Sequence, residues 1–311
     1  MATEDAFRSD LPVFQNLGRT AEERRWLDAL PGLVAELERR WHVRTAAPYQ
    51  AGTSSWVAPG VTPDGRRVVL KVAWPHREAR AESAGLLFWA GDGAVLVHEA
   101  DPERYALLLE RCEPGTALSE AGLPTEDALV VAGELLTRLW AAPPGDLPTI
   151  ESLGDVTTDW AVLVRERTDR LRLPFDAALI RHGAAMLESL SASAARTVLV
   201  HGDFNAGNLL RARRQPWLAI DAKPMLGDPG YDPAPLLSQL DPPWGTAGSA
   251  QALRHRFTLF ADLVGEPVER LLAWAFARAV ESAVWRASEG ELADGVAEMA
   301  EAAVLADLTG L

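Results

Sequence analysis

The sequence predicts a bilobal α+β protein, with a small antiparallel sheet lobe in residues 1–110 and a larger helical lobe in residues 111–311. The chain has 311 residues, which is more than a single hydrophobic core usually supports. Short apolar runs separated by turn residues occupy residues 43–109, a pattern typical of antiparallel strands. Beyond residue 115 the apolar residues recur with the spacing of amphipathic helices.

Residues 1–18 are expected to be poorly structured. A helical segment is expected to follow them and to precede the sheet. Thr20 and Glu23 have the spacing of a capping box, in which each side chain accepts from the other residue's backbone N–H. Because proline has no backbone N–H, Pro31-Gly32 is expected to interrupt the helix. A second amphipathic segment then continues to Trp41.

The sheet and the helical lobe follow in order. A turn at Pro63-Asp64-Gly65 and another at Asp101-Pro102-Glu103 separate apolar runs, and a helix is expected over residues 76–90. Strands are expected at 56–58, 68–72, 94–98 and 105–109. The composition shifts at 109–115, and helices are expected at 125–141, 158–171, 175–192, 249–264, 267–288 and 291–308.

Composition and charge narrow the class of protein. A hydrophobic content of 48% and a charged content of 24% are typical of soluble globular proteins, and we expect a cytoplasmic location. Cys112 is the only cysteine, which excludes an internal disulfide and a cysteine-based zinc site. The net charge of −14 argues against nucleic-acid and anionic-membrane partners and suits a cationic small molecule, although solubility alone also explains it.

The segment from Val198 to Asp221 carries the pattern with the clearest chemistry. An apolar run ending at Val200 leads into His201-Gly202-Asp203, and Asn208 follows five residues after Asp203. A second apolar run ends on Asp221. Phosphoryl transfer requires such a set, with an Asp to accept the proton of a hydroxyl and an Asn and an Asp to hold Mg²⁺ against nucleotide phosphates. His201 is expected to position the loop.

Lys71 lies within an apolar strand and therefore needs an anion or access to solvent. A strand lysine paired with a helix glutamate can hold nucleotide phosphates. Glu78 and Glu82 both follow within reach, and Glu82 is preferred because it is closer to the apolar end of its helix. An edge-strand lysine in solvent is the alternative.

Two further sets of residues have weaker signals. The loop that ends in Ser54 and Ser55 offers amides and hydroxyls that could cover phosphates, but it contains one glycine and matches no phosphate-loop motif, so an ordinary polar loop is the alternative. Asp228 and Asp232 are either part of the site or a turn acid and a helix cap.

Together these residues resemble the antibiotic phosphotransferase group, which is similar in fold to eukaryotic protein kinases. The segment HGDFNAGN resembles the group's H-x-D-x-x-x-x-N loop. The segment WLAIDAKPMLGDPGYD resembles the I-D-P-K-P…G-D-P-x-x-D pattern of the streptomycin 6-kinase and hydroxyurea phosphotransferase family. The resemblance extends over most of the chain and implies a protein-kinase-like fold.

The resemblance also implies roles. Asp203 would be the catalytic residue, Asn208 and Asp221 the Mg²⁺ ligands, and Lys71, held by Glu82, a contact to the phosphates of ATP. The backbone from Glu110 to Cys112 would bind the adenine edge. Departures from the family pattern occur at Ala222, Met225 and Phe204-Asn205, and the last of these bears on the acceptor.

We therefore expect an ATP- and Mg²⁺-dependent phosphotransferase that acts on a hydroxyl of a small cationic antibiotic, with a streptomycin-like aminoglycoside as the first choice. Acids such as Asp155, Asp159, Glu281 and Glu289 lie on helices that would line the acceptor pocket. The alternatives are a kinase of hydroxyurea, a cationic peptide antibiotic or a metabolite, and a nucleotide-binding module without transfer activity.

Overall fold

The computed structural model describes residues 4–241, 244 and 249–310, which form two compact units. The first unit contains residues 1–115 and the short segment 212–218, and the second contains residues 116–211 and 219–311. The division after Gly115 falls close to the boundary predicted at 110. The inclusion of residues 212–218 in the first unit was not predicted.

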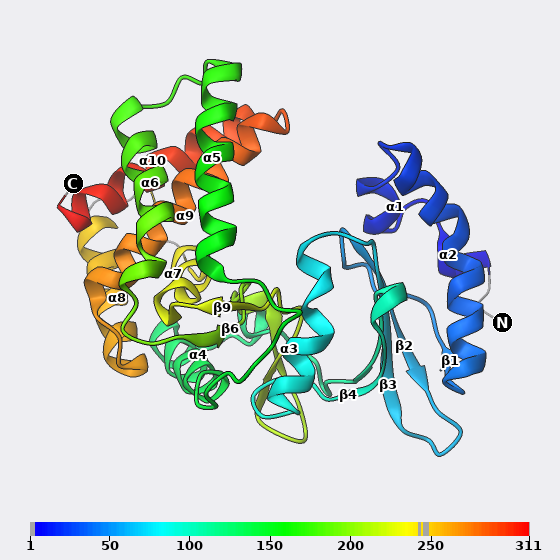
Figure 1. The fold of residues 1–311 in the computed structure, drawn as a ribbon. Coiled ribbons are helices and arrows are strands. Elements are labelled where there is room, and N and C mark those ends of the chain that lie inside the picture. The colour runs from blue at the N-terminus through cyan, green and yellow to red at the C-terminus, as the bar shows by residue number, and fades with distance from the viewer. Residues whose placement is uncertain (1–3, 242–243, 245–248, 311) are drawn as a thin grey trace. The chain divides into compact units, whose positions relative to one another are not determined.

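The first unit is built on one antiparallel sheet (Figure 1). The strand order is β1-β2-β3-β5-β4, and the predicted pairing of the strands around residues 56 and 70 is present. β4 begins three residues later than predicted, and a register shift between Val97 and Glu99 marks a bulge in its pairing with β5. The strands are β1 (Arg44–Thr45), β2 (Ser55–Val61), β3 (Arg67–Ala73), β4 (Val97–Asp101) and β5 (Ala106–Glu110).

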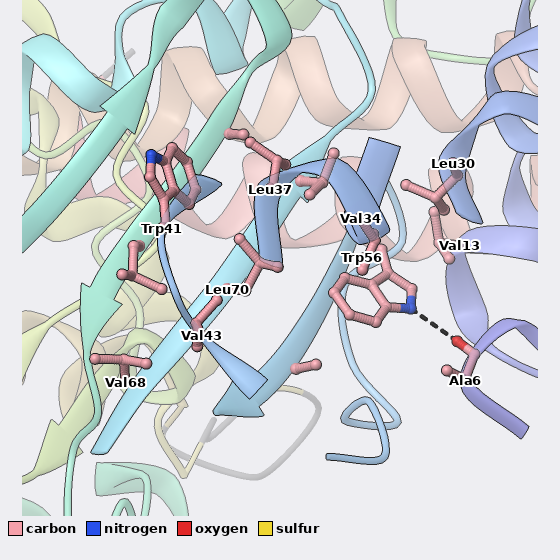
Figure 2. Close-up of a cluster of buried hydrophobic side chains, with 14 of the residues drawn as sticks. Ala6, Val13, Leu30, Val34, Leu37, Trp41, Val43, Trp56, Val68 and Leu70 are labelled. Atoms are coloured by element: carbon pink, nitrogen blue, oxygen red, sulfur yellow. Dashed lines mark hydrogen bonds between the residues drawn. The ribbon is translucent and has the colours of Figure 1, made fainter. Parts of the chain in front are cut away.

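One face of the sheet is covered by the N-terminal elements, which are η1 (Glu4–Phe7), α1 (Pro12–Asn16) and α2 (Ala21–Arg40). Figure 2 shows the indole of Trp56 donating to the carbonyl oxygen of Ala6 at 2.8 Å. Leu11 and Val13 are buried in the same cluster. The expectation that residues 1–18 are poorly structured is therefore wrong for the described residues 4–18, because their apolar side chains complete the core.

α2 runs without interruption through Pro31, contrary to the prediction. The predicted capping box of Thr20 and Glu23 is confirmed. Leu30, Val34 and Leu37 are all fully buried on one side of the helix. Burial of this continuous apolar face offsets the single backbone hydrogen bond that proline removes.

The other face of the sheet carries α3 (Glu82–Trp89), which follows a 3₁₀ turn, η2 (Glu78–Arg80). This helix is shorter than the one predicted over residues 76–90. Side chains alternate between the two faces along β3. Leu70 and Val72 belong to the cluster beneath α2, so Lys71 between them points to the side on which α3 lies. The turn η3 (Pro102–Arg104) joins β4 and β5.

The second unit consists mainly of helices around α9 (Val268–Ser288), which contacts α5, α6, α7, α8 and α10. Trp274 and Phe276 of α9 are completely buried. α5 begins before the predicted start at residue 158, and α7 was not predicted. The other helices are α4 (Thr125–Leu139), α5 (Leu153–Leu171), α6 (Ala177–Ser189), α7 (Pro233–Gln239), α8 (Ser249–Val264) and α10 (Leu292–Thr309).

The segment from Val198 to Asp221 contributes to two small strand pairs. β6 (Val198–Val200) pairs with β9 (Met225–Gly227), and β7 (Leu209–Arg211) pairs with β8 (Trp217–Ala219). Short 3₁₀ turns complete the unit: η4 (Leu118–Glu120), η5 (Ser191–Ser193), η6 (Ala206–Asn208) and η7 (Pro229–Tyr231). Among the described residues, no helix has the length and apolar character that a membrane crossing requires.

Candidate active site

Two loops of the second unit are joined by backbone hydrogen bonds. The first loop follows β6 and contains His201 and Asn208, and the second follows β8 and contains Asp221. The Lys223 N–H donates to His201 O at 2.8 Å, and the Ile220 N–H donates to Asn208 O at 2.9 Å. These two bonds bring the loop that carries Asp203 and Asn208 beside the one that carries Asp221, as the candidate site requires.

Asp203 lies in the first loop with its side chain about one-quarter exposed. Its Oδ1 accepts from the amide of Asn205 at 3.1 Å. Its Oδ2 lies 3.4 Å from the ammonium nitrogen of Lys223. The carboxylate is thus held through both oxygens and remains accessible to a substrate hydroxyl, which is the arrangement a general base needs.

Asn208 and Asp221 provide oxygen donors of the kind that Mg²⁺ prefers. The amide nitrogen of Asn208 donates to Asp203 O at 2.9 Å, which leaves its carbonyl oxygen as the atom to face a cation. Within the described residues, no three His, Cys, Asp or Glu side chains gather as a metal site. One carboxylate and one amide fit Mg²⁺, because this ion commonly takes few protein ligands and completes its shell with phosphates and water.

His201 is completely buried and acts within the loop, as the sequence indicated. Its Nδ1 accepts from the Asp203 N–H at 3.3 Å, and its Nε2 lies 3.0 Å from Ile220 O. These partners identify the neutral tautomer with the proton on Nε2. Burial lowers the pKa of His201, so the ring stays neutral and connects the two loops rather than transferring protons.

Asp232 holds the first loop from behind. Its completely buried carboxylate accepts from the backbone N–H groups of His201 and Gly202, both at 2.8 Å, and from the indole of Trp140 at 3.0 Å. Burial raises the pKa of Asp232, and these donors oppose that rise. The side chain makes no capping hydrogen bond to α7, so the helix-cap interpretation is wrong and its structural role lies in the loop.

Asp228 is also structural, and its surroundings agree with the turn-acid interpretation. Its Oδ1 accepts from Gly230 N–H at 2.9 Å in η7. Its Oδ2 accepts from the indole of Trp274 at 2.5 Å and from Arg270 Nε at 2.6 Å. Because the carboxylate is almost fully buried against α9, it fixes the end of β9 and does not face a ligand.

The candidate nucleotide residues belong to the first unit. Lys71 Nζ lies 2.7 Å from Glu82 Oε1, and both side chains are buried. The solvent-exposed alternative for Lys71 is therefore wrong, and Glu82 is a partner as preferred over Glu78. A buried ion pair fixes the ammonium in one place, which suits a group that positions phosphates.

The loop before β2 turns sharply. Gly52 has φ +84°, and a Cβ there would lie 2.6 Å from Ser55 O, so only glycine fits without strain. Ser55 begins β2 and is buried, while Ser54 is partly exposed. The Ser54 carbonyl accepts from Trp74 N–H at 2.8 Å, which ties the loop to the end of β3. This end of the sheet therefore presents a compact turn, and the partly exposed Ser54 carries a hydroxyl at its edge.

Glu110 and Cys112 lie where β5 leaves the sheet. The carboxylate of Glu110 accepts from Leu96 N–H at 3.1 Å and from Arg214 at 2.9 to 3.0 Å, so the side chain is occupied and only the backbone can serve a nucleotide base. Burial, with the nearby Glu110 charge, raises the pKa of Cys112 to about 12. The thiol is consequently protonated and unreactive at neutral pH.

The role of Lys223 and the part that Asn205 plays within the loop were not predicted. The Asn205 side chain accepts from Gly207 N–H at 2.9 Å and Asn208 N–H at 3.2 Å while its amide donates to Asp203. An Asn that begins a Gly-containing turn is a cap signal, and this signal was present in the sequence. Nothing local in the sequence indicated the ion pair of Lys223.

Curated relatives match almost the whole chain. It is 37% identical over 296 residues to a hydroxyurea phosphotransferase from Kitasatospora aureofaciens, covering 93% of this chain and 83% of that protein. It is 34% identical over 291 residues to a streptomycin 6-kinase from Streptomyces griseus, covering 92% of each.

Solved structures share the fold. A choline kinase from Streptococcus pneumoniae matches with a TM-score of 0.64 and 15% identity, covering 89% of this chain and 99% of the other. An aminoglycoside phosphotransferase matches with a TM-score of 0.60 and 19% identity, with the same coverage. These likenesses confirm the predicted α+β, protein-kinase-like fold class. The sequence model of the aminoglycoside/hydroxyurea antibiotic resistance kinases matches residues 40–290, and the chain therefore belongs to that family of phosphotransferases.

Proposed function

We propose that the protein transfers the γ-phosphoryl group of ATP, with Mg²⁺, to a hydroxyl of a small cationic antibiotic, most closely a streptomycin-like aminoglycoside. The observation that carries the proposal is Asp203, a part-exposed carboxylate held through both oxygens in a loop that is bonded to the segment carrying Asp221. Because ATP is the co-substrate, the proposal includes a cytoplasmic location.

In this mechanism, Asp203 orients the acceptor hydroxyl and accepts its proton. The hydroxyl oxygen forms a bond to the γ-phosphorus while the bond between that phosphorus and the ADP oxygen breaks. Asn208 and Asp221 would hold Mg²⁺, which supplies positive charge against the phosphates when bound. Lys71, fixed by Glu82, positions the nucleotide. Since the transition state is loose, positioning and electrostatic stabilisation provide most of the acceleration.

Several features support a cationic acceptor. Asp155 and Asp159 lie one turn apart on α5 and are exposed, and α5 packs on α9, which carries Glu281. Arg167 lies 4.0 Å from Glu281, so that carboxylate is partly compensated. The net charge of −14 attracts cations at long range. The two streptomycin 6-kinases among the relatives support the same class.

Hydroxyurea is the second candidate, because one relative of 37% identity is a hydroxyurea phosphotransferase. A panel of possible acceptors distinguishes the two candidates. It contains streptomycin, other aminoglycosides and hydroxyurea, each incubated with the protein, ATP and Mg²⁺. Mass spectrometry would report the addition of one phosphate. We expect modification of streptomycin, and modification of hydroxyurea alone would replace the first candidate by the second.

The test of the mechanism is Asp203→Asn. Loss of the proton acceptor should lower kcat by about 10²- to 10⁴-fold, while nucleotide affinity changes little. Asp262→Asn on α8 is the matched control, because Asp262 is an exposed carboxylate of the same unit and its removal should leave kcat unchanged. Unchanged turnover in Asp203→Asn would refute the assignment. A wild-type protein that binds ATP but phosphorylates no acceptor would favour a nucleotide-binding module instead.

A further inference from the structure

Lysine is rare in this chain, and each of its two lysines lies against a carboxylate that the sequence analysis singled out. Lys71 and Lys223 are the only two lysines among thirty Lys and Arg residues. The other 28 of these basic residues are arginines. Lysine differs from arginine in carrying a compact point charge on a flexible stem. The two lysines therefore differ in chemical character from the other basic side chains of the chain.

The backbone of Lys223 is held in place by three features. The Lys223 N–H donates to His201 O at 2.8 Å. Gly202 has φ +83°, and a Cβ there would lie 2.0 Å from Lys223 O, so the close approach of the two segments requires glycine. Met225, two residues further on, pairs with Val200 in the β6–β9 ladder. The backbone of Lys223 is thus locked against the loop that carries Asp203.

The side chain of Lys223 reaches Asp203 but remains partly open. Its ammonium lies 3.4 Å from Asp203 Oδ2, and the two side chains are 37% and 26% exposed. Ion pairs with this exposure contribute little to stability. The pair therefore has little structural value, and yet the fold locks the backbone of Lys223 against the loop of Asp203, the residue that would accept the hydroxyl proton.

We propose that Lys223 is a further catalytic residue, whose ammonium binds the oxygens of the phosphoryl group during transfer. The inference rests on the proposed function. The proton of the acceptor hydroxyl passes to Asp203, the new oxygen–phosphorus bond forms as the bond to ADP breaks, and Lys223 keeps its proton throughout. Charge on the equatorial oxygens of the transferring group attracts a positioned ammonium, and the ion pair with Asp203 holds that ammonium ready before the nucleotide binds.

The first experiment compares two nucleotides that differ in the γ-phosphoryl group. Titration calorimetry with MgCl₂ would measure the affinities of ADP and of the β,γ-imido analogue of ATP for wild type and Lys223→Met. We expect the variant to lose about tenfold in affinity for the analogue, the size expected of a charge-assisted hydrogen bond, and to bind ADP as wild type does. Unchanged ADP affinity also reports that the variant is folded.

Two controls separate a direct contact from an effect through Asp203. In an Asp203→Asn background, Lys223→Met should still weaken binding of the analogue, whereas a lysine that acts only on Asp203 would have no further effect. Arg254→Met removes an exposed ion pair, 3.6 Å to Glu269, and should leave the ratio of the two affinities unchanged. An unchanged ratio in Lys223→Met would overturn the proposal.

A second readout uses the scarcity of lysine. Acetylation by an N-hydroxysuccinimide ester, followed by mass spectrometry, reports Lys71 and Lys223 separately. The analogue with MgCl₂ should slow acetylation of Lys223, while ADP should not. Equal rates with and without the analogue would contradict the contact. If wild type bound neither nucleotide, the proposed function would fail together with this inference, whereas normal binding with an unchanged ratio would remove only the role of Lys223.

Discussion

At the scale of single residues, Asn205 shows how a side chain outside the expected catalytic set shapes the site. Its oxygen caps the turn by accepting from Gly207 and Asn208, and its amide donates to the carbonyl and carboxylate oxygens of Asp203 at 3.3 and 3.1 Å. All its hydrogen-bonding positions are used inside the loop. Asn205 was expected to bear on the acceptor, but these contacts indicate that it orients Asp203.

Two substitutions separate the two functions of Asn205. Asn205→Asp keeps the capping oxygen but loses the amide donor, so kcat should fall about 10- to 100-fold with little change in KM for ATP. Asn205→Ala loses both, and should also lower the free energy of unfolding by about 1 kcal/mol, the usual value of a cap. Steady-state kinetics and chemical denaturation measure these effects. Wild-type kcat in Asn205→Asp would exclude the orienting role.

At the scale of elements, α2 shows that burial can outweigh a local signal. The sequence predicted a break at Pro31, yet the helix continues because Leu30, Val34 and Leu37 form one buried face over the sheet. Only one hydrogen bond is lost at Pro31, whereas an interrupted helix would not present all three side chains to the same core.

Substitution of Leu37 measures how much the packing of α2 on the sheet contributes to stability. Leu37→Ala should lower the free energy of unfolding by roughly 2–5 kcal/mol, because the side chain is fully buried and its removal leaves a cavity. Leu87→Ala on α3 is the matched control, since Leu87 is 55% exposed and should change stability by less than about 0.5 kcal/mol. Equal effects of the two substitutions in urea denaturation would contradict the packing described for α2.

At the scale of the whole molecule, the first unit is completed by a segment from far along the chain. Residues 212–218 belong to it although the residues on either side belong to the second unit. Arg214 donates to Glu110, to Gly91 O at 2.6 Å and to Ala94 O at 2.9 Å. The segment lies in sequence between the proposed metal ligands Asn208 and Asp221. The chain between those ligands is therefore anchored in the first unit.

Arg214→Met tests this anchoring. Loss of several charge-assisted hydrogen bonds from a side chain that is 30% exposed should lower the free energy of unfolding by about 2 kcal/mol. Arg213→Met is the matched control, because Arg213 is 80% exposed, lies 3.7 Å from Glu113 and should contribute less than about 0.5 kcal/mol. If both variants denatured at the same urea concentration as wild type, residues 212–218 would not stabilise the first unit.

The sequence by itself determined the features that depend on nearby residues. Alternation and helical period located most strands and helices, and the five-residue spacing of Asp203 and Asn208 placed both in one loop. The capping box of Thr20 and the apolar surroundings of Lys71 were equally local. Such patterns are readable because they reflect the geometry of a single strand, helix or turn.

Tertiary structure decided which distant groups meet. It paired Lys223 with Asp203 and Asp232 with the backbone of the loop, and it carried α2 through Pro31. These outcomes depend on hydrogen bonds and burial between segments far apart in the chain. Periodicity contains no information about such contacts, because it reports only the direction in which neighbouring side chains point.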